Sequence, residues 1–374
     1  MRILIDNSNL FAGGGIQVAV SLLNDLKKIE TLHEFIVLQP TGMKGKIEEI
    51  SFDSKFTFVQ IDEKVHLNIL KRVSYSRKVE EKFRPDIIFT VFGPSYYKSK
   101  VPKIVGMAIP YLIYPDSPFF EKLGFKEKIK YRILSILKSR FFKKNSDALI
   151  FESEAARKIF TERFSYKKPT YTVNNTLNTI FLEKERWQSI DLPQDKFNIL
   201  CLSANYPHKN LNIIPQVIEI LKTKKPNFKF TFNISASAED FPWAENKCEN
   251  VNFLGHVPLE KIPDLYVKSD LLFFPTLLEV FSTTYLEALK MQVPIVTSDM
   301  PFSRDVCDNG AIYCKPTDPL EYAEAIICIF ENSEIRHNLM TEQSKIIKKF
   351  ATSEERTKKY LSIIEKTYNN ANQK

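Results

Sequence analysis

Two glutamates, Glu279 and Glu287, stand eight positions apart in the stretch from Leu271 to Asp299. The apolar run LLFFPT precedes them and PIVTSD follows, and such short runs are typical of buried parallel strands. A helical pattern that opens near Ser282 lies between the two runs. Ligands of parallel sheets collect at the carboxyl ends of strands, and the N–H groups of a helix start favour phosphate. The stretch therefore predicts a nucleotide-sugar site with both glutamates beside the ligand.

A purely structural interpretation of the same residues stays open. Thr284 and Glu287 fit a capping box, T-x-x-E, in which the glutamate only satisfies a backbone donor at the start of the helix. Pairs of glutamates at this spacing are common. The motif alone therefore leaves ligand binding and helix capping as alternatives.

Three further segments occur in a set order around this pair. They are LSANYPHKNL at 202–211, VNFLGHVPLEKIPDLYVKSDLLFFPT at 251–276 and PFSRDVCDNGAIYCKPTDPLEYAEAI at 301–326. Together with the E-x7-E pair they resemble the retaining GT-B glycosyltransferases of family 4, the "group 1" transferases, over roughly residues 195–350. The resemblance implies an α/β fold of GT-B architecture, in which two Rossmann-like domains face each other across a cleft.

The resemblance also implies roles for individual residues. Lys209 and Glu279 would be the catalytic residues: the lysine stabilises the charge of the leaving diphosphate, and the glutamate binds the transferred sugar. Glu287 would bind the ribose of the nucleotide. The other expected donor-binding residues are Gly14, Gly15, Asn205, Gly255, His256, Val257, Phe281, Ser282 and Thr283.

Some positions depart from the family pattern. Members usually carry an arginine five positions before the lysine, and here that position is Ala204. Val280–Thr283 replaces a glycine-containing G-F-G-L, which leaves less open access to the phosphate. Leaving-group stabilisation would then rest more on Lys209, or another cation such as Arg304 has taken the arginine's place. FGPSYY at 92–97 resembles a loop that some members present to the cleft, with an ordinary turn as the alternative.

Strand-like runs alternate with helical patterns in two successive series, which predicts two doubly wound sheets. We expect an N-terminal Rossmann-like acceptor-binding domain at 1–185 and a C-terminal nucleotide-sugar-binding domain at 190–350. Residues 351–374, opened by a T-x-x-E capping box at Thr352, are expected to form a helix that returns to the first domain. Three consecutive glycines after the first strand indicate a loop close to a ligand, or else a mobile turn.

Neither a metal nor a cofactor is expected beside the nucleoside-diphosphate sugar donor. The chain contains no D-x-D motif, and its five histidines are scattered. The five cysteines form no C-x-x-C pair, so we interpret them as reduced packing residues of a cytosolic enzyme.

The net charge of +8 favours anionic partners. No zinc-finger, basic-zipper or RNA-recognition signature accompanies it, so nucleic acid is not an expected partner. Much of the charge falls within 121–144, where apolar residues recur between lysines and arginines at helical spacing. Such a helix is typical of an anionic membrane interface, and a surface helix packing its apolar face on its own domain is the alternative. With no signal peptide and no apolar run of about 20 residues, we expect a cytoplasmic enzyme held peripherally on the cell membrane.

These observations predict a retaining, metal-independent glycosyltransferase. It would move a hexose from a nucleoside-diphosphate sugar to a saccharide or lipid-linked saccharide acceptor in cell-envelope polysaccharide biosynthesis. A nucleotide-sugar 2-epimerase of the same fold and a catalytically silent sugar-nucleotide-binding protein remain alternatives.

Overall fold

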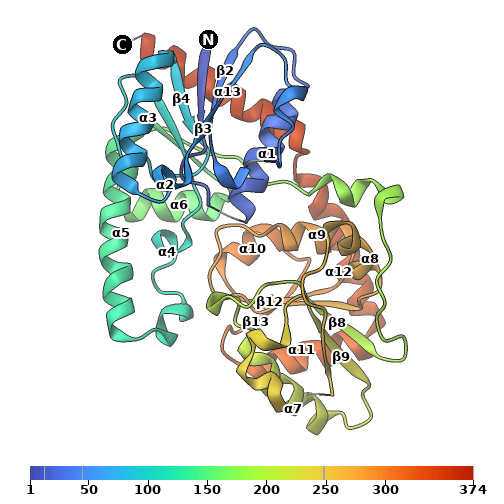
Figure 1. Ribbon diagram of the computed structural model, residues 1–374. Helices are drawn as coiled ribbons and strands as arrows, with labels where there is room; N and C mark the ends of the chain where they lie inside the picture. Colours follow the sequence, from blue (N-terminus) through green and yellow to red (C-terminus); the bar gives the residue numbers. More distant parts are fainter. Residues whose placement is uncertain (12, 44, 247–248, 374) are drawn as a thin grey trace. The chain divides into compact units, whose positions relative to one another are not determined.

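The computed structural model describes residues 1–11, 13–43, 45–246 and 249–373 (Figure 1). The chain divides into two compact units. Unit 1 comprises Met1–Ile113, Phe125–Asn175 and Ala351–Lys374, and unit 2 comprises Tyr114–Gly124 and Thr176–Phe350. Residues 114–124 thus group with unit 2 although the chain on both sides of them belongs to unit 1.

Unit 1 contains a sheet of seven parallel strands in the order β3-β2-β1-β4-β5-β6-β7. The strands are β1 (Arg2–Asp6), β2 (Glu34–Pro40), β3 (Phe56–Ile61), β4 (Ile87–Thr90), β5 (Lys103–Met107), β6 (Ala148–Phe151) and β7 (Thr170–Thr172). After β1 the chain first builds outward through β2 and β3, and then returns to place β4 on the other side of β1. The topological switch point of this sheet therefore lies between β1 and β4.

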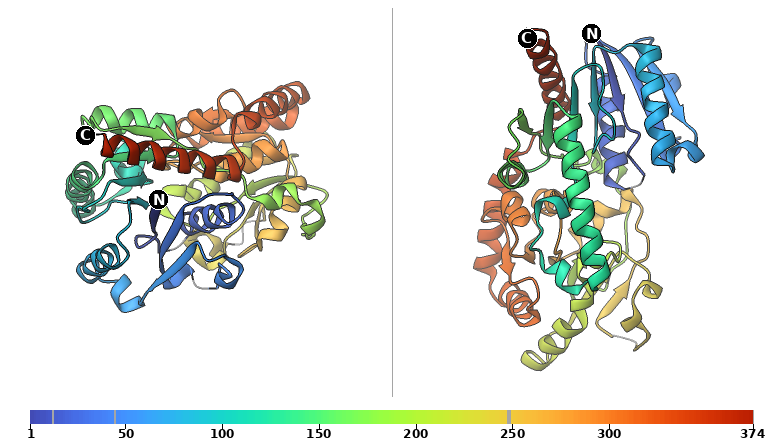
Figure 2. Two further views of the ribbon diagram at one scale, coloured as in Figure 1. Left: turned by 90° about the horizontal axis from the view of Figure 1, so that it is seen from above. Right: turned by 90° about the vertical axis from the view of Figure 1, so that its left-hand side faces the viewer.

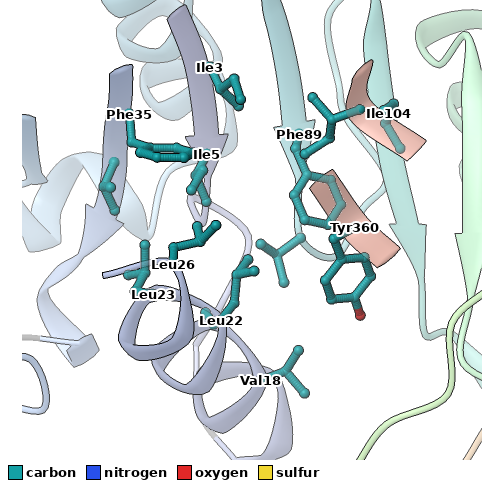
Figure 3. Close-up of a cluster of buried hydrophobic side chains, with 14 of the residues drawn as sticks. Ile3, Ile5, Val18, Leu22, Leu23, Leu26, Phe35, Phe89, Ile104 and Tyr360 are labelled. Atoms are coloured by element: carbon teal, nitrogen blue, oxygen red, sulfur yellow. The ribbon is translucent and has the colours of Figure 1, made fainter. Parts of the chain in front are cut away.

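Unit 1 also contains several α-helices. They are α1 (Gly14–Leu26), α2 (Glu63–His66), α3 (Ile69–Phe83), α4 (Pro110–Ile113), α5 (Phe125–Asn145), α6 (Glu154–Arg163) and α13 (Ser353–Asn372). Figure 3 shows Val18 and Leu22 of α1, Phe89 of β4 and Tyr360 of α13 in one buried cluster against the sheet. Helix α13 starts with the predicted capping box, since the Thr352 hydroxyl accepts from the backbone N–H of Glu355.

Unit 2 contains a second parallel sheet, of six strands in the order β10-β9-β8-β11-β12-β13. The strands are β8 (Phe197–Cys201), β9 (Phe230–Ile234), β10 (Val251–Phe253), β11 (Leu271–Phe274), β12 (Ile295–Ser298) and β13 (Ile312–Cys314). The helices are α7 (Ile214–Lys224), α8 (Ile262–Val267), α9 (Thr283–Met291), α10 (Pro301–Cys307), α11 (Pro319–Glu331) and α12 (Ser333–Ile346). Its switch point lies between β8 and β11.

Both sheets are all-parallel and doubly wound, as the alternating strand and helix patterns predicted. The LLFFPT and PIVTSD runs form β11 and β12, whose residues are entirely buried because helices cover a parallel sheet on both faces. Cys201, Cys307 and Cys314 are buried free thiols and Cys328 is a half-buried one, while Cys248 lies outside the described residues. Among the described residues, no helix is long and apolar enough to cross a membrane.

Candidate functional site

Lys209 and Glu279, predicted as the catalytic residues, meet at the carboxyl edge of the unit 2 sheet. Lys209 lies in the loop after β8 and Glu279 in the loop after β11, on the two sides of the switch point. The lysine Nζ lies 2.5 Å from Oε1 of the glutamate. The side chains keep 16% and 14% of their surfaces exposed, so the ion pair is largely enclosed yet reachable by a ligand.

The backbone holds the two loops against each other. The Leu277 N–H donates to the His208 carbonyl over 2.7 Å. The Thr276 hydroxyl lies 3.0 Å from Glu279 Oε1 and 3.3 Å from the same carbonyl. Asn210, at φ 59°, turns the chain directly after the lysine. These contacts position both charged side chains. Thr276 was not among the predicted site residues, although its position at a strand end, three residues before Glu279, could have indicated it.

The lysine also lies over an aromatic ring. Its Nζ is 4.8 Å from the ring centroid of Phe274, the last residue of β11. Next to it, burial lowers the pKa of His208, and the charge of Lys209 lowers it further while that of Glu279 opposes the shift. At neutral pH the imidazole is therefore mostly uncharged, and Lys209 is the cation of this loop.

Helix α9 begins beside this pair, at Thr283, with Ser282 as its N-cap residue. The Ser282 side chain makes no capping hydrogen bond. The capping-box interpretation of Thr284 and Glu287 is wrong, because Thr284 lies inside the helix and Glu287 binds elsewhere. The first turn of α9 therefore keeps backbone N–H donors that no side-chain cap occupies, as an anion site requires.

The carboxyl group of Glu287 accepts a hydrogen bond from the Tyr266 hydroxyl over 3.0 Å. Burial raises the pKa of this carboxyl to about 7, against the opposing hydrogen bonds from Tyr266 and Thr283. Its side chain is nonetheless partly accessible at the surface. Glu287 therefore changes its charge close to neutral pH. The sequence analysis did not identify Tyr266, which belongs to a helix distant in sequence.

The predicted base-pocket residues form a turn after β10. Gly255 has φ +62°, a conformation that strongly favours glycine, and its N–H donates to the Ala236 carbonyl over 3.2 Å. His256 is exposed, whereas Val257 is buried. The turn thus exposes a polar side chain and buries an apolar one.

The remaining predicted donor-binding residues differ in their surroundings. The Asn205 amide donates to the Asp240 carbonyl over 2.5 Å, so this side chain already has a backbone partner. Phe281 is half-buried beside the start of α9. Gly14 and Gly15 belong to unit 1, where they open helix α1. A Cβ on Gly15 would approach a Leu10 methyl at 3.2 Å, whereas one on Gly14 would meet nothing within 4 Å.

Arg304, considered as a substitute for the family's missing arginine, is occupied by other groups. Its Nε and Nη2 donate to the two carboxylate oxygens of Asp299 over 2.5 and 2.8 Å. The guanidinium also lies 4.3 Å from the Tyr313 ring centroid. With more than half of its side chain exposed, it forms a surface ion pair.

A different cation lies near the loop that carries Lys209. Lys122, from the segment 114–124 that groups with unit 2, donates to the Asn210 side chain, and burial lowers its pKa. In the same segment the Ser117 hydroxyl donates to the Leu277 carbonyl over 2.6 Å. Sequence reasoning missed this segment because its charge was assigned to the following helix.

Among the described residues, no three or more His, Cys, Asp or Glu side chains are grouped so that they could hold a metal ion. Lys209 and Lys122 lie by the loop after β8, whereas Arg304 is paired with Asp299 after β12. An anionic ligand here would therefore meet Lys209 and the backbone donors of α9.

The C-terminal part of the chain is similar to known glycosyltransferases. Residues 183–346 match the family described as "Glycosyl transferases group 1". The O-antigen chain mannosyltransferase RfbU of Salmonella typhimurium is 24% identical over 221 residues, which are 56% of this chain and 57% of that protein. An uncharacterized glycosyltransferase of Methanocaldococcus jannaschii, MJ1059, is 24% identical over 300 residues, 73% of this chain and 71% of the relative. The match to the mannosyltransferase spans less than two thirds of that protein's length.

Solved structures share the whole architecture. Sucrose-phosphate synthase from Thermosynechococcus elongatus has a TM-score of 0.72 at 12% identity, covering 99% of both chains. HepE of Anabaena, solved in complex with UDP-glucose, has a TM-score of 0.69 at 13% identity, covering 98% of this chain and 99% of that one. At such low identity the likeness shows the fold alone, which is the predicted GT-B fold.

Proposed function

We propose that this glycosyltransferase, whose residues 183–346 match the group 1 family, moves a hexose from a nucleoside-diphosphate sugar to a saccharide or lipid-linked saccharide acceptor. Transfer would retain the anomeric configuration, need no metal ion and serve cell-envelope polysaccharide biosynthesis. One observation carries the proposal: the Lys209–Glu279 pair lies at the switch point of the unit 2 sheet, beside a helix start without a side-chain cap.

The proposed chemistry follows from the charges at this site. Breaking the bond between sugar and diphosphate leaves negative charge on the diphosphate. Lys209 and the first N–H groups of α9 would stabilise that charge. Without a ligand, Glu279 neutralises the ammonium group of Lys209. An ammonium group has three N–H donors, so Lys209 can bind a phosphate oxygen and still donate to Glu279. The second oxygen of Glu279 would accept from a hydroxyl of the donor sugar and orient it.

The nucleoside would bind along α9 and the turn after β10. Glu287, ionised, would accept hydrogen bonds from the ribose hydroxyls, and Tyr266 keeps its carboxyl in place. Val257 and the Gly255 turn would contact the base. The name of one relative specifies a mannosyltransferase and one similar structure holds UDP-glucose, which supports a nucleotide-linked hexose as donor.

Metal independence is proposed from the composition of the site. A divalent ion on a diphosphate is held by carboxylates and other oxygen ligands. The chain lacks a D-x-D motif, and Glu279 is paired with a lysine. Activity should therefore persist in excess chelator, and its loss on chelation, with recovery on adding Mg²⁺ or Mn²⁺, would refute this part of the proposal.

Replacement of the central lysine tests the reaction. Lys209→Ala should lower turnover by a factor on the order of a hundred or more, because it removes a charge stabiliser of the leaving group. Lys290→Ala is the matched control, since Lys290 is exposed in the last turn of α9. Folding is verified by circular dichroism. A folded Lys209→Ala enzyme with wild-type turnover would show that the assignment is wrong.

The donor and the alternatives are separated by product analysis. A panel of uridine, guanosine and thymidine diphosphate sugars is screened by thermal shift, because a donor well above its Kd stabilises the fold by a few kcal/mol. An epimerase would change the sugar nucleotide without any acceptor. A silent binding protein would bind the nucleotide and show neither transfer nor donor hydrolysis. The anomeric configuration of a transfer product, read by NMR, tests retention.

We also propose that helix α5 contacts an anionic membrane. Five of its apolar residues are exposed, Phe125 at 79%, Ile129 at 39%, Ile133 at 52%, Ile136 at 55% and Leu137 at 45%, whereas Phe142 is buried and Leu134 and Phe141 are partly buried. The side of α5 that is buried carries Ser135, Ser139, Phe142 and Asn145 instead. These exposed apolar residues support contact with lipid, while Phe141 and Phe142 pack on unit 1. The right-hand view of Figure 2 turns α5 toward the viewer.

The exposed side of α5 mixes these apolar residues with lysines and arginines, so both hydrophobic and charge attraction to anionic lipid are available. Each basic residue near such a surface contributes about 1 kcal/mol. Liposome flotation tests this with a variant that changes four α5 residues to Gln: Lys126, Lys128, Lys130 and Arg132. A control changes four exposed lysines on α3 and α6 to Gln: Lys71, Lys78, Lys82 and Lys158. The proposal would be contradicted if both variants floated with anionic liposomes to the same extent. It would also be contradicted if the wild type bound neutral vesicles as well as anionic ones.

A further inference from the structure

Unit 1 has its own switch point, and a cluster of buried polar residues lies there. Asp6, Asn7 and Ser8 at the end of β1 are all at most 4% exposed, and Thr90 at the end of β4 is fully buried. In parallel sheets, ligands bind outside the carboxyl ends of strands where the strand order reverses. The equivalent edge of unit 2 carries Lys209 and Glu279. The buried polar residues at the edge of unit 1 are the candidates for a second ligand site.

Arg72 of α3 lies next to this cluster and brings a positive charge to it. It is 7% exposed, and its Nη1 donates to the His66 carbonyl over 2.8 Å. Among the described residues, no carboxylate forms a salt bridge with it. Asp6 attracts it at longer range, but the Asp6 oxygens accept from the Ser8 N–H over 3.0 Å and from the Thr90 hydroxyl over 3.3 Å. A buried cation without a paired anion is costly, so its remaining donors call for an acceptor.

Aromatic rings flank the guanidinium. Its Cζ lies 5.3 Å from the ring centroid of Phe11 and 5.9 Å from that of Tyr96. Phe11 is also stacked on His66, with centroids 4.3 Å apart, and is itself 52% exposed. An arginine held between rings is limited in its orientation, and its edge donors stay free for a planar or tetrahedral oxyanion.

Further polar atoms in the cluster lack partners. Both side-chain amide atoms of Asn7, which is fully buried, and the buried Nε2 of His66 have no hydrogen-bond partner. The Ser8 backbone contacts the His66 ring, which places these residues next to one another. Buried polar atoms are normally satisfied, so unpartnered polar atoms, the Asn7 Nδ2 donor among them, next to an unpaired arginine indicate a ligand with several polar atoms.

Aromatic side chains continue away from Arg72. Tyr96 contacts Phe141 of α5 with centroids 5.1 Å apart, and Tyr111 contacts Tyr131 of α5 at 5.2 Å. Lys138 of α5 lies 5.4 Å from the Tyr111 ring. The FGPSYY loop, which the proposed transfer chemistry does not use, supplies Tyr96. Rings of this kind present flat apolar faces with polar edges, which suit a sugar ring.

We propose that Arg72, His66 and Asn7 bind a phosphate group of the acceptor, and that Tyr96 and Tyr111 hold the sugar next to it. This inference rests on the proposed glycosyl transfer and assigns the acceptor's chemical class: a phosphorylated saccharide. Phosphate matches the site because it offers more acceptor oxygens than a carboxylate and pairs with arginine in two parallel hydrogen bonds. The phosphate belongs either to a soluble sugar phosphate or to a lipid-linked one.

Binding of defined probes to the full chain tests this. The Lys209→Ala background is used so that phosphate at the donor site does not contribute. Glucose 1-phosphate should bind this background by calorimetry, and methyl glucoside, which lacks phosphate, should bind at least tenfold more weakly. Adding Arg72→Gln should weaken glucose 1-phosphate at least tenfold, while adding Lys78→Gln, an exposed residue of the same helix, should not. Farnesyl phosphate in detergent, compared with glucose 1-phosphate, distinguishes the lipid-linked source from the soluble one.

Two further measurements keep the test decisive. If Arg72→Gln does not fold, Arg72→Lys keeps the charge but loses the planar fork, and should still weaken glucose 1-phosphate severalfold. In the Lys209→Ala protein, glucose 1-phosphate should also slow hydrogen exchange in residues 63–83. Equal affinity of the Arg72 and Lys78 variants, or no protection of 63–83, overturns the inference. Failure of the proposed reaction would appear separately, as wild-type turnover of Lys209→Ala.

Discussion

Removing the Tyr266 hydroxyl should raise the pKa of Glu287 and shift the pH dependence of nucleotide binding. The hydroxyl donates to Glu287 Oε2 over 3.0 Å, and this hydrogen bond favours the ionised carboxyl. Burial works in the opposite direction and is the larger effect, which places the pKa of Glu287 at about 7. Tyr266→Phe leaves burial in place and deletes one opposing hydrogen bond, so ionisation of Glu287 should need a higher pH.

The size of the shift follows from the geometry. A hydrogen bond to a charged group contributes about 1.5–3 kcal/mol, and about 1.4 kcal/mol corresponds to one pKa unit. The single proton of the hydroxyl is shared, because the Thr284 carbonyl also lies within 3.2 Å of it. We therefore expect the lower end, a rise of about one unit. At pH 7 the ionised fraction of Glu287 would fall from about a half to about a tenth, which weakens nucleotide binding about fivefold if the carboxylate binds the ribose.

Calorimetric titration with the nucleoside diphosphate of the preferred donor, between pH 5.5 and 9, measures this shift. Wild-type affinity should rise through pH 7, and the Tyr266→Phe curve should follow about one unit higher and meet the wild type near pH 9. Tyr285→Phe is the matched control, because this buried tyrosine of α9, the helix that carries Glu287, hydrogen-bonds to Thr297 instead. Identical midpoints for Tyr266→Phe and wild type, or an equal shift in the control, would refute the reasoning.

Four other variants follow from the same structure. Glu287 binds a proton more tightly in the folded state, with a pKa raised from 4.5 to about 7. Its contribution to folding stability is therefore present at low pH and lost as pH rises through 7. The melting temperature of Glu287→Gln should rise relative to that of the wild type between pH 5 and 8. A Cβ on Gly106 would lie 1.8 Å from the Val91 carbonyl oxygen, and Gly106→Ala should cost about 1–3 kcal/mol in urea unfolding, whereas Gly14→Ala, with nothing within 4 Å, should be neutral or stabilise by up to about 1 kcal/mol. Thr352→Ala removes the capping box of α13 and should cost about 1 kcal/mol in the same assay.

Local sequence signals were reliable where the structure depends on nearby residues. The capping box at Thr352 starts α13 as predicted, because both of its partners lie within one turn. The similar pattern at Thr284, which the sequence left open, is not a capping box, because Ser282 is the N-cap residue of α9 and Thr284 lies inside the helix. The carboxyl group of Glu287 accepts hydrogen bonds from the side chains of Tyr266 and Thr283. The two patterns are alike in sequence, and the packing of α8 against α9 separates them.

Hydrophobic periodicity and turn residues by themselves determined the two parallel α/β sheets, because each strand and helix is specified by its own neighbours in sequence. The order of the strands within each sheet depends on tertiary contacts instead. Lys209 and Glu279 are 70 positions apart and meet only because β8 and β11 are adjacent. Arg72 reaches the end of β1 from α3, and residues 114–124 group with unit 2, through tertiary contacts that no local pattern encodes. Periodicity specifies which face of an element is buried, and only the folded chain decides which distant side chains share that interior.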